Sequence, residues 1–328
     1  MVIAVDAAGG DHYPENPVSG AIEAINERDD LIILLVGPEP TIQKELQKHS
    51  FDPKRIQVLD APEIIGMDES PSTAVKSKQN SSIVMGIGAH KKGKCKAFVS
   101  AGNTGALLAA SIFILGKLQG VRRPTIAATI PTGEGIKLLV DAGANLDLKP
   151  EAYVQFAQMG TIYSREIMGI KNPKIGLINV GEEQEKGTDL LKEVYKLLDN
   201  LPNFHGNVEG KDIFKGIVDI YLTDGLIGNI LLKFGESIPA TVQQAVENSM
   251  EEMNLDSNTR ETVVKILFKS LRPYNYEEIG GIPFLGVNGI SMVGHGGSSP
   301  VAIKNMILNA ARCVETGVNE KIVTSLHE

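Results

Sequence analysis

The chain has 328 residues, of which 42% are hydrophobic and 22% charged, a balance typical of a folded globular protein. Its formal net charge of -8 disfavours general binding to nucleic acid, because that function needs a basic surface. Cys95 and Cys313 are too few for a disulfide framework or a metal knuckle, and they suit a reducing compartment.

The first expected element, Val2–Val5, is an apolar run with β-strand character, and no basic leader segment precedes it. The sequence contains no run of about 18 apolar residues, the length that a helix needs to cross a bilayer. We therefore expect a cytoplasmic protein without a signal peptide or a membrane span, still able to touch a membrane surface.

Short apolar runs alternate with longer amphipathic segments along most of the chain. The apolar runs predict β-strands at Val2–Val5, Leu31–Val36, Ile56–Leu59, Ala97–Val99, Ile175–Ile178 and Val218–Leu222. The apolar spacing predicts helices at Pro71–Lys91, Gly105–Leu118, Pro150–Met168 and Lys186–Leu198. This alternation is typical of an α/β protein with a largely parallel sheet.

Two segments break the alternation. Thr125–Ile130 and Ile136–Val140 predict a β-hairpin, so the sheet should be mixed. From Leu231 to Pro273 no convincing strand occurs, and Asp256 begins a turn and helix cap in the middle, so we predict a helical hairpin. We expect one three-layer α/β/α domain over residues 1–328, with the hairpin inserted at about 231–273.

Polar, glycine-rich turns follow several of the predicted strands. They are DAAGGDH at 6–12, SAGNTGA at 100–106, NVGEEQEKG at 179–187, TDGLIGN at 223–229 and GHGGSS at 294–299. Free backbone amides at such turns can hold an anion, although the same residues also make ordinary turns and helix caps. Because ligands bind where parallel strands end, we expect the turns to share one rim of the sheet.

Several common catalytic and cofactor-binding motifs are absent from the sequence, which reduces the number of reactions that it could catalyse. The sequence has no nucleotide P-loop, no dinucleotide fingerprint, no G-x-S-x-G elbow and no histidine pair at metal-ligand spacing. Transfer of an acyl group from a thioester to phosphate needs none of these motifs, because phosphate is already anionic and a thiolate is a good leaving group. Amides and a lysine suffice to stabilise the carbonyl oxyanion. We expect neither a metal nor an organic cofactor.

Seven motifs follow one another along the chain, and their combination is highly specific. In order, they are DAAGGDH, SAGNTGA, DAGANLDLKPE, NVGEEQEKG, GNVEGKD, TDGLIGN and FLGVNGISMVGHG. Together they resemble the bacterial acyl-ACP:phosphate acyltransferase family, PlsX, from residue 2 to about residue 312. Ala8, where the family commonly has Met, and the segment 297–300 depart from the family pattern.

The resemblance implies a fold like that of phosphate acetyltransferases and isocitrate-type dehydrogenases. It implies transfer of a fatty acyl group from acyl carrier protein to inorganic phosphate, which gives acyl phosphate for phospholipid synthesis. It also implies a homodimer that associates peripherally with the inner face of the cell membrane through a helical hairpin.

Lys186, Asn229 and His12 are the predicted catalytic residues. Lys186 lies at the predicted start of a helix, where a cation opposes the helix dipole, so we interpret it as a phosphate or oxyanion ligand rather than a solvated lysine. Asn229 could cap a helix or donate to phosphate or the thioester carbonyl. His12 could be a satisfied histidine at a helix start, a phosphate ligand or a proton shuttle.

The polar turns also predict a binding site for phosphate and substrate. The predicted binding residues are Asp6, Gly9, Gly10, Asp11, Gly102, Asn103, Thr104, Gly105, Gly228 and His295. We expect Asp6 and Asp11 to orient the backbone and His12, while His295 also suits a purely structural role.

The second arm of the predicted hairpin, Thr259–Leu271, combines an apolar stripe with the basic residues Lys265, Lys269 and Arg272. Its predicted contact residues for a membrane or the carrier protein are Val264, Lys265, Leu267, Phe268 and Lys269. A dimer or core helix with snorkelling lysines would give the same pattern.

Three other functions compete with the acyl carrier protein enzyme. A phosphate acetyltransferase acting on short acyl-CoA would use the same chemistry, but the hairpin favours the larger substrate. A metal- and NAD-dependent dehydrogenase needs an acidic pair, and Asp219 and Asp224 are five residues apart, which does not place both on one helix face. Glu182 and Glu183 are a second pair of carboxylates considered for a metal. A non-enzymatic membrane scaffold would not need the polar turns.

Overall fold

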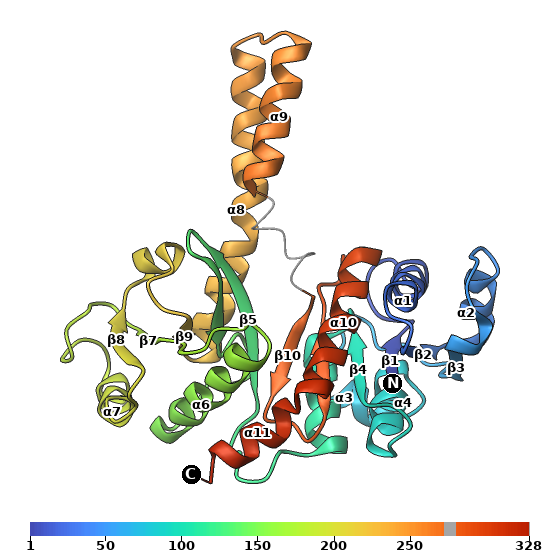
Figure 1. The fold of residues 1–328 in the computed structure, drawn as a ribbon, viewed down its shortest axis with the longest axis horizontal. Coiled ribbons are helices and arrows are strands. Elements are labelled where there is room, and N and C mark those ends of the chain that lie inside the picture. Colours follow the sequence, from blue (N-terminus) through green and yellow to red (C-terminus); the bar gives the residue numbers. More distant parts are fainter. Residues whose placement is uncertain (272–279, 328) are drawn as a thin grey trace.

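The structure, a computed structural model, describes residues 1–271 and 280–327 (Figure 1). One sheet of eleven strands runs through these residues, in the order β3-β2-β1-β4-β11-β10-β5-β6-β9-β7-β8. The strands are β1 Val2–Asp6, β2 Ile32–Gly37, β3 Ile56–Asp60, β4 Ala97–Ser100, β5 Thr125–Thr132, β6 Gly135–Val140, β7 Ile175–Ile178, β8 Phe204–Val208, β9 Ile220–Leu222, β10 Ile282–Leu285 and β11 Ile290–Val293.

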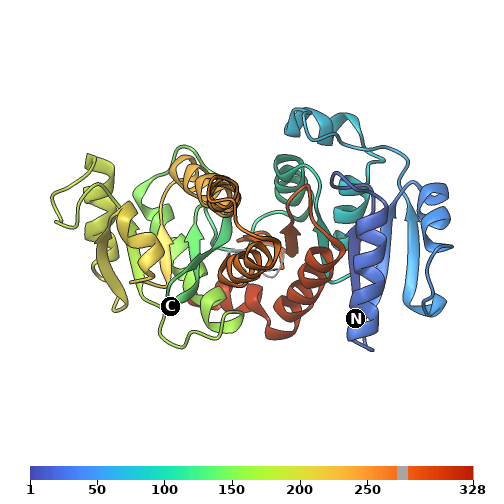
Figure 2. The same ribbon diagram turned by 90° about the horizontal axis from the view of Figure 1, so that it is seen from above.

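Helices cover both faces of the sheet, which gives the three layers of the prediction (Figure 2). The α-helices are α1 Glu15–Glu27, α2 Glu39–Leu46, α3 Pro71–Ser77, α4 Ser82–Lys91, α5 Thr104–Ala110, α6 Pro150–Glu166, α7 Asp189–Leu198, α8 Gly225–Glu252, α9 Ser257–Leu271, α10 Pro300–Thr316 and α11 Val318–Ser325. Short helical turns are η1 Pro53–Arg55, the π-helix η2 Ser111–Leu115 and η3 Gly210–Lys215.

Each face of the sheet has its own apolar core, because successive side chains of a strand point to opposite faces. In β1, Ile3 and Val5 belong to the core on the face that α1 and α10 cover, whereas Ala4 belongs to the core on the other face, where α4 covers β1. All three side chains are fully buried or nearly so. The apolar runs read as strands therefore form the centre of an α/β/α sandwich.

The sheet is mixed, as predicted, but its two ends run in opposite directions. Strands β3, β2, β1, β4 and β11 are parallel to one another. Antiparallel pairing of β10 with β11 and β5, and of β5 with β6, then reverses the direction. Strands β6, β9, β7 and β8 are parallel within the second group. The expectation that all five polar turns share one rim is therefore wrong.

Several predicted boundaries also differ from the structure. The helix predicted at Pro71–Lys91 is divided into α3 and α4, because Ser81 caps a new helix by accepting a hydrogen bond from the Val84 N–H. The helix predicted from Gly105 continues beyond α5 only as the π-helix η2. The helix predicted from Lys186 begins at Asp189, where Thr188 is the cap.

The helical hairpin is present as α8 and α9 and projects from the sheet (Figure 1). Its first arm begins at Gly225, earlier than predicted, because Asp224, two residues after the end of β9, accepts a hydrogen bond from the Ile227 N–H at 2.9 Å. Asp256 caps the second arm as predicted, accepting hydrogen bonds from the N–H groups of Asn258 and Thr259. Arg272 and Pro273 lie outside the described residues.

Candidate functional site

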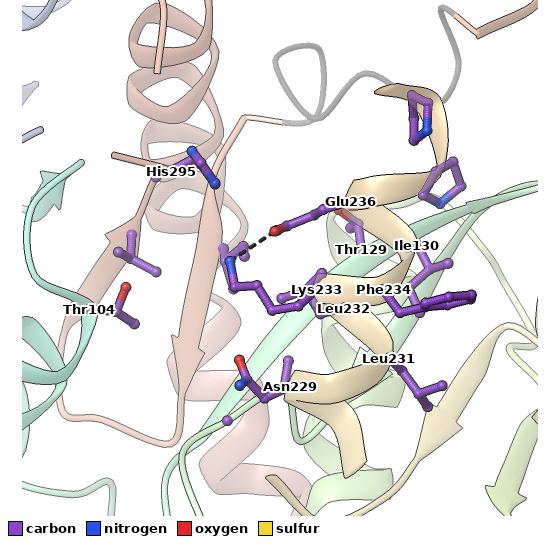
Figure 3. Close-up of a pocket in the computed structure, with 18 of the residues that line it drawn as sticks. Thr104, Thr129, Ile130, Asn229, Leu231, Leu232, Lys233, Phe234, Glu236 and His295 are labelled. Carbon is purple, nitrogen blue, oxygen red and sulfur yellow. Dashed lines mark hydrogen bonds and ion pairs between the residues drawn. The ribbon is translucent and has the colours of Figure 1, made fainter. Parts of the chain in front are cut away.

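A cavity of about 1030 Å³ lies between the loops of the first sheet half and the base of the helical hairpin (Figure 3). One wall consists of residues that follow β1, β4 and β11, including Asp11, Thr104 and His295. The opposite wall consists of β5, the segment after β6 and helix η3. Helices α8 and α9 complete the cavity. Residues from both directions of the sheet therefore meet in one space.

Helix α8 contributes both polar and apolar residues to the wall of this cavity. Asn229, Lys233 and Glu236 are spaced by four and three residues, so they lie on one face of the helix. The Lys233 Nζ atom is 2.8 Å from Glu236 Oε2, and Figure 3 shows both side chains extending into the cavity. Asn229 was predicted, whereas Lys233 and Glu236 were missed. Counting one and two helical turns onward from Asn229 would have found Lys233 and Glu236, respectively.

The buried carboxylate of Asp141 organises the loop that supports Asn229. It accepts hydrogen bonds from the N–H groups of Ile126, Ala144 and Asn145 at 2.8–3.2 Å. Burial raises the pKa of Asp141 above its ordinary value, and these hydrogen bonds partly oppose that shift. The carbonyl oxygen of Asn145 in turn accepts a hydrogen bond from the Gly225 N–H at 2.7 Å. Asp141 therefore holds the first turn of α8 in place through Asn145.

Asp6 organises the loops on the other side of the cavity. It is buried, accepts the Ser100 hydroxyl at 2.6 Å and accepts the Ala8 N–H at 3.1 Å. Burial is the main cause that raises the pKa of Asp6, while the Ser100 hydrogen bond lowers it. A Cβ atom on Gly9 would lie 2.5 Å from Asp6 Oδ2, so only glycine fits there. Asp6 and Gly9 therefore do not line the cavity, but they hold the loops that do.

The other glycines of this region also shape the backbone. Gly10 has a φ of +94°, which favours glycine, and the Gly102 N–H donates to Ser100 Oγ at 2.9 Å. Gly105 lies on the cavity wall, where a Cβ atom would meet Pro71. Gly228 lies one residue before Asn229 and contacts the Asp141 backbone rather than the cavity.

Asn103 and Thr104 have different environments although they are neighbours. The buried Asn103 side chain caps α5 by accepting the Ala106 N–H at 3.0 Å. Its amide nitrogen donates to the carbonyl oxygens of Gly66, Met67 and Glu69. Through these hydrogen bonds the Asn103 side chain holds the 66–69 loop in place. Thr104 is exposed and faces the cavity (Figure 3).

The predicted histidines are also separated. His295 lines the cavity, its carbonyl oxygen accepts the Ser298 hydroxyl at 2.6 Å, and its Nδ1 accepts the Gly297 N–H at 3.3 Å. Asp11 lines the cavity beside it, and its N–H donates to the Gly296 carbonyl oxygen. His12 is exposed before α1 and does not line the cavity.

Lys186 lies on an exposed loop three residues before α7, and its side chain does not line the cavity. Its carbonyl oxygen accepts a hydrogen bond from the Asn179 amide at 3.1 Å. The predicted start of a helix at Lys186 is wrong because Gly187, with a φ of +87°, separates it from the Thr188 cap.

The acidic residues considered for a metal have separate partners. Asp219 pairs with Lys137 at 2.7 Å, and Asp224 caps α8. Glu182 lies 3.8 Å from Lys211, and Glu183 is exposed. The described residues contain no group of three or more His, Cys, Asp or Glu side chains placed to hold a metal ion.

The hairpin residues predicted to contact a membrane or carrier protein divide into two groups. Val264, Leu267 and Phe268 face the cavity, whereas Lys265 and Lys269 are exposed and do not line it. Lys265 pairs with Glu261 one turn earlier. Across the described ranges, no helix has the length and apolar character needed to span a bilayer.

Comparison with known proteins identifies the family. Residues 1–321 match the model of a family described as "Fatty acid synthesis protein". The chain belongs to this family. It is 46% identical over 337 aligned positions to the phosphate acyltransferase of Chlorobaculum parvum, with 99% of each chain covered. It is 47% identical to the phosphate acyltransferase of Chlorobaculum tepidum, covering 97% of this chain and 99% of that one.

This membership confirms the resemblance to the PlsX family and identifies the chain as an acyltransferase enzyme. The fold is similar to that of the EutD phosphotransacetylase from Staphylococcus aureus, with a TM-score of 0.60, 14% identity and coverage of 95% and 94% of the two chains. A phosphotransacetylase from Streptococcus pyogenes gives a TM-score of 0.60 at 15% identity, with 96% and 94% covered. The predicted phosphate acetyltransferase-like fold is therefore confirmed.

Proposed function

We propose that this chain transfers a fatty acyl group from acyl carrier protein to inorganic phosphate, releasing acyl phosphate and free carrier protein for phospholipid synthesis. One observation carries the proposal. A single cavity joins a polar region around Asn229 to an apolar wall formed by α8 and α9. A charged nucleophile and a long hydrocarbon chain need these two surfaces next to each other.

The proposed reaction is direct attack of bound phosphate on the thioester carbonyl. A phosphate oxygen forms a C–O bond, the carbonyl becomes a tetrahedral oxyanion, and the C–S bond then breaks to release the carrier thiolate. A thiol has a pKa of about 8.5, so the departing sulfur needs little help from an acid. The enzyme has to place the reactants and stabilise the oxyanion.

Asn229 is the proposed hydrogen-bond donor to this oxyanion or to the phosphate. Its side chain lies on the cavity wall, and within the described part of the chain it has no hydrogen-bond partner of its own. The Asp141 loop fixes the helical turn that carries it. A donor already placed by the fold stabilises developing charge without reorganising during the reaction.

The apolar wall favours a long acyl chain over the acetyl group of a short acyl-CoA. Leu232 and Phe234 of α8 and Val264, Leu267 and Phe268 of α9 line the cavity. An acetyl group would leave most of this surface exposed, whereas a fatty acyl chain would bury it. We therefore retain acyl carrier protein as the donor and short acyl-CoA as the competing donor.

We further propose that residues 1–328 act as one catalytic unit within a cytoplasmic homodimer that contacts the inner face of the membrane. The hairpin supports this assembly, because Ile266 is 61% and Phe268 72% exposed in one chain. Surfaces of this kind are commonly covered by a second copy or a lipid interface. The nearby Lys265 and Lys269 would attract anionic lipids or an acidic carrier protein.

The test is an assay of the purified chain with palmitoyl carrier protein and phosphate, without metal or nucleotide. We expect phosphate-dependent formation of palmitoyl phosphate and free carrier thiol. Acetyl-CoA under the same conditions is the matched donor. Faster turnover of acetyl-CoA than of palmitoyl carrier protein would contradict the proposed donor.

A further inference from the structure

We infer that Lys233 is the cation that binds phosphate in the cavity, and that Glu236 competes with phosphate for it. The inference rests on the proposed function for the identity of the anion. Among the described residues along the cavity wall, Lys233 is the one lysine or arginine. The side chain is 58% exposed, so its ammonium group is open to a ligand that enters from solvent.

The position of Lys233 suits a phosphate next to Asn229. The two residues are four apart in α8, so their side chains emerge one helical turn apart on the same face. Figure 3 shows Lys233 extending from α8 toward the side of the cavity that holds Thr104 and His295. An anion held by Lys233 would therefore lie within the space that Asn229 also faces.

The charges around the cavity favour a cation at this position. Asp11, Glu236 and Glu247 also line it, and their carboxylates repel a phosphate dianion. The tetrahedral oxyanion would add a further negative charge beside the phosphate. A lysine ammonium at this position offsets both repulsions.

Glu236 explains how Lys233 is held before phosphate arrives. The two side chains form an ion pair of 2.8 Å, and the Lys233 side chain is largely open to water. Water screens an exposed pair of this kind, so its strength is small. A phosphate dianion can therefore replace the Glu236 carboxylate as the partner of Lys233.

The experiment measures binding of inorganic phosphate to the full-length chain by isothermal titration calorimetry. Lys233→Ala should raise the Kd about tenfold to a hundredfold, the usual effect of losing a hydrogen bond to a charged group. Lys233→Arg should restore most of the affinity. Glu236→Gln should lower the Kd about twofold to fivefold, because an exposed competing charge is removed.

Lys192→Ala is the matched control, because Lys192 is also a helical lysine paired with an aspartate three residues away, at 3.5 Å, outside the cavity. Lys233→Met keeps most of the side-chain stem and separates loss of charge from loss of packing. Thermal unfolding of each variant shows whether it is folded.

In steady-state assays Lys233→Ala should raise the KM for phosphate far more than the KM for the acyl donor. Wild-type phosphate affinity in Lys233→Ala, or weaker binding in Glu236→Gln, would overturn the inference. The calorimetry needs no acyl donor. Phosphate binding that depends on Lys233 in a chain inactive toward acyl carrier protein would therefore reject the proposed donor and keep the phosphate site.

Discussion

Gly228 packs so closely against the carbonyl oxygen of Asp141 that a Cβ atom at residue 228 would overlap this oxygen. The contact joins the first turn of α8 to the end of β6, and Asn229 is the next residue. Because the obstructing atom belongs to the backbone, a side chain at residue 228 would have to push the helix away from the strand.

Gly228→Ala should therefore lower both stability and turnover. Overpacking of this kind costs about 1–3 kcal/mol of unfolding free energy, and displacement of Asn229 should also lower kcat. Gly235→Ala in the same helix is the control, because a Cβ atom there meets nothing within 4 Å. This control should be neutral or up to about 1 kcal/mol more stable by chemical denaturation. Equal stability of the two variants would contradict the packing argument.

Asn229→Ala tests the proposed donor. Removal of one oxyanion-hole donor typically lowers kcat by about 10²-fold or more, and we expect this effect in phosphate-dependent consumption of palmitoyl carrier protein. Thermal unfolding should change little, because the side chain is exposed. If kcat stays within about threefold of wild type, smaller than the loss of any such donor, Asn229 does not stabilise the transition state.

His90 should make the stability depend on pH. Its Nδ1 donates to the Cys95 carbonyl oxygen at 3.1 Å, and its Nε2 accepts the Ile290 N–H at 3.1 Å, which requires the neutral ring. Burial lowers the pKa of His90 below 6.5. The unfolded chain therefore binds a proton first as the pH falls, so this contribution is complete above pH 6.5 and is lost progressively below it.

Chemical denaturation at about pH 7.5 and about pH 5.5, on either side of the ordinary imidazole pKa, measures this loss. His90→Gln keeps a polar side chain that does not titrate, and it should show a smaller difference between the two conditions. The same pH dependence in wild type and variant would assign the effect to other groups.

The two cysteines should be dispensable for catalysis. Both are buried, and burial raises the pKa of Cys95 to about 11 and that of Cys313 to about 12, so neither forms a thiolate near neutral pH. Cys95→Ala with Cys313→Ala should keep kcat near the wild-type value. A trapped acyl-enzyme that disappears in this double variant would contradict direct attack by phosphate.

The two faces of α9 should separate membrane contact from catalysis. Ile266 is exposed and does not line the cavity, whereas Leu267 does. Ile266→Glu should reduce flotation with anionic liposomes and leave activity toward acyl carrier protein in solution intact. Leu267→Glu should also reduce that activity, because a carboxylate would enter the acyl wall. If Ile266→Glu instead yields a monomer, the exposed face is a dimer contact.

Local sequence patterns predicted the strands of the sheet best where apolar runs were uninterrupted, as in Leu31–Val36. Strands β8, β10 and β11 were missed because none of them is an uninterrupted apolar run. Gly206 interrupts β8, Pro283 interrupts β10 and Ser291 interrupts β11. Strand direction is set by pairing between distant segments, as between β10 and β5, and no local pattern records it. For this reason the sequence wrongly predicted that all five polar turns lie at one rim of the sheet.

Some residues that line the candidate site could be picked out from the sequence, but their arrangement could not. Asn229, Thr104 and His295 were singled out as polar residues near strand ends, and the cavity does bring them together. Asn103 has the same side-chain amide as Asn229. Its amide nitrogen, however, donates hydrogen bonds to three carbonyl oxygens of the 66–69 loop, which is distant in the sequence. Lys186 and Lys233 both lie near polar turns, and only the path of α8 places Lys233 on the cavity wall.

Helix α8 is one continuous element of 28 residues, about 42 Å at the usual rise per residue. Near its start it carries Asn229 and Lys233, and at its far end it forms the outer half of the hairpin. The candidate site and the projecting arm are therefore parts of one helix, with Pro239 between them. A second copy, a carrier protein or a lipid surface that bound the arm would therefore contact the same helix that carries Asn229 and Lys233.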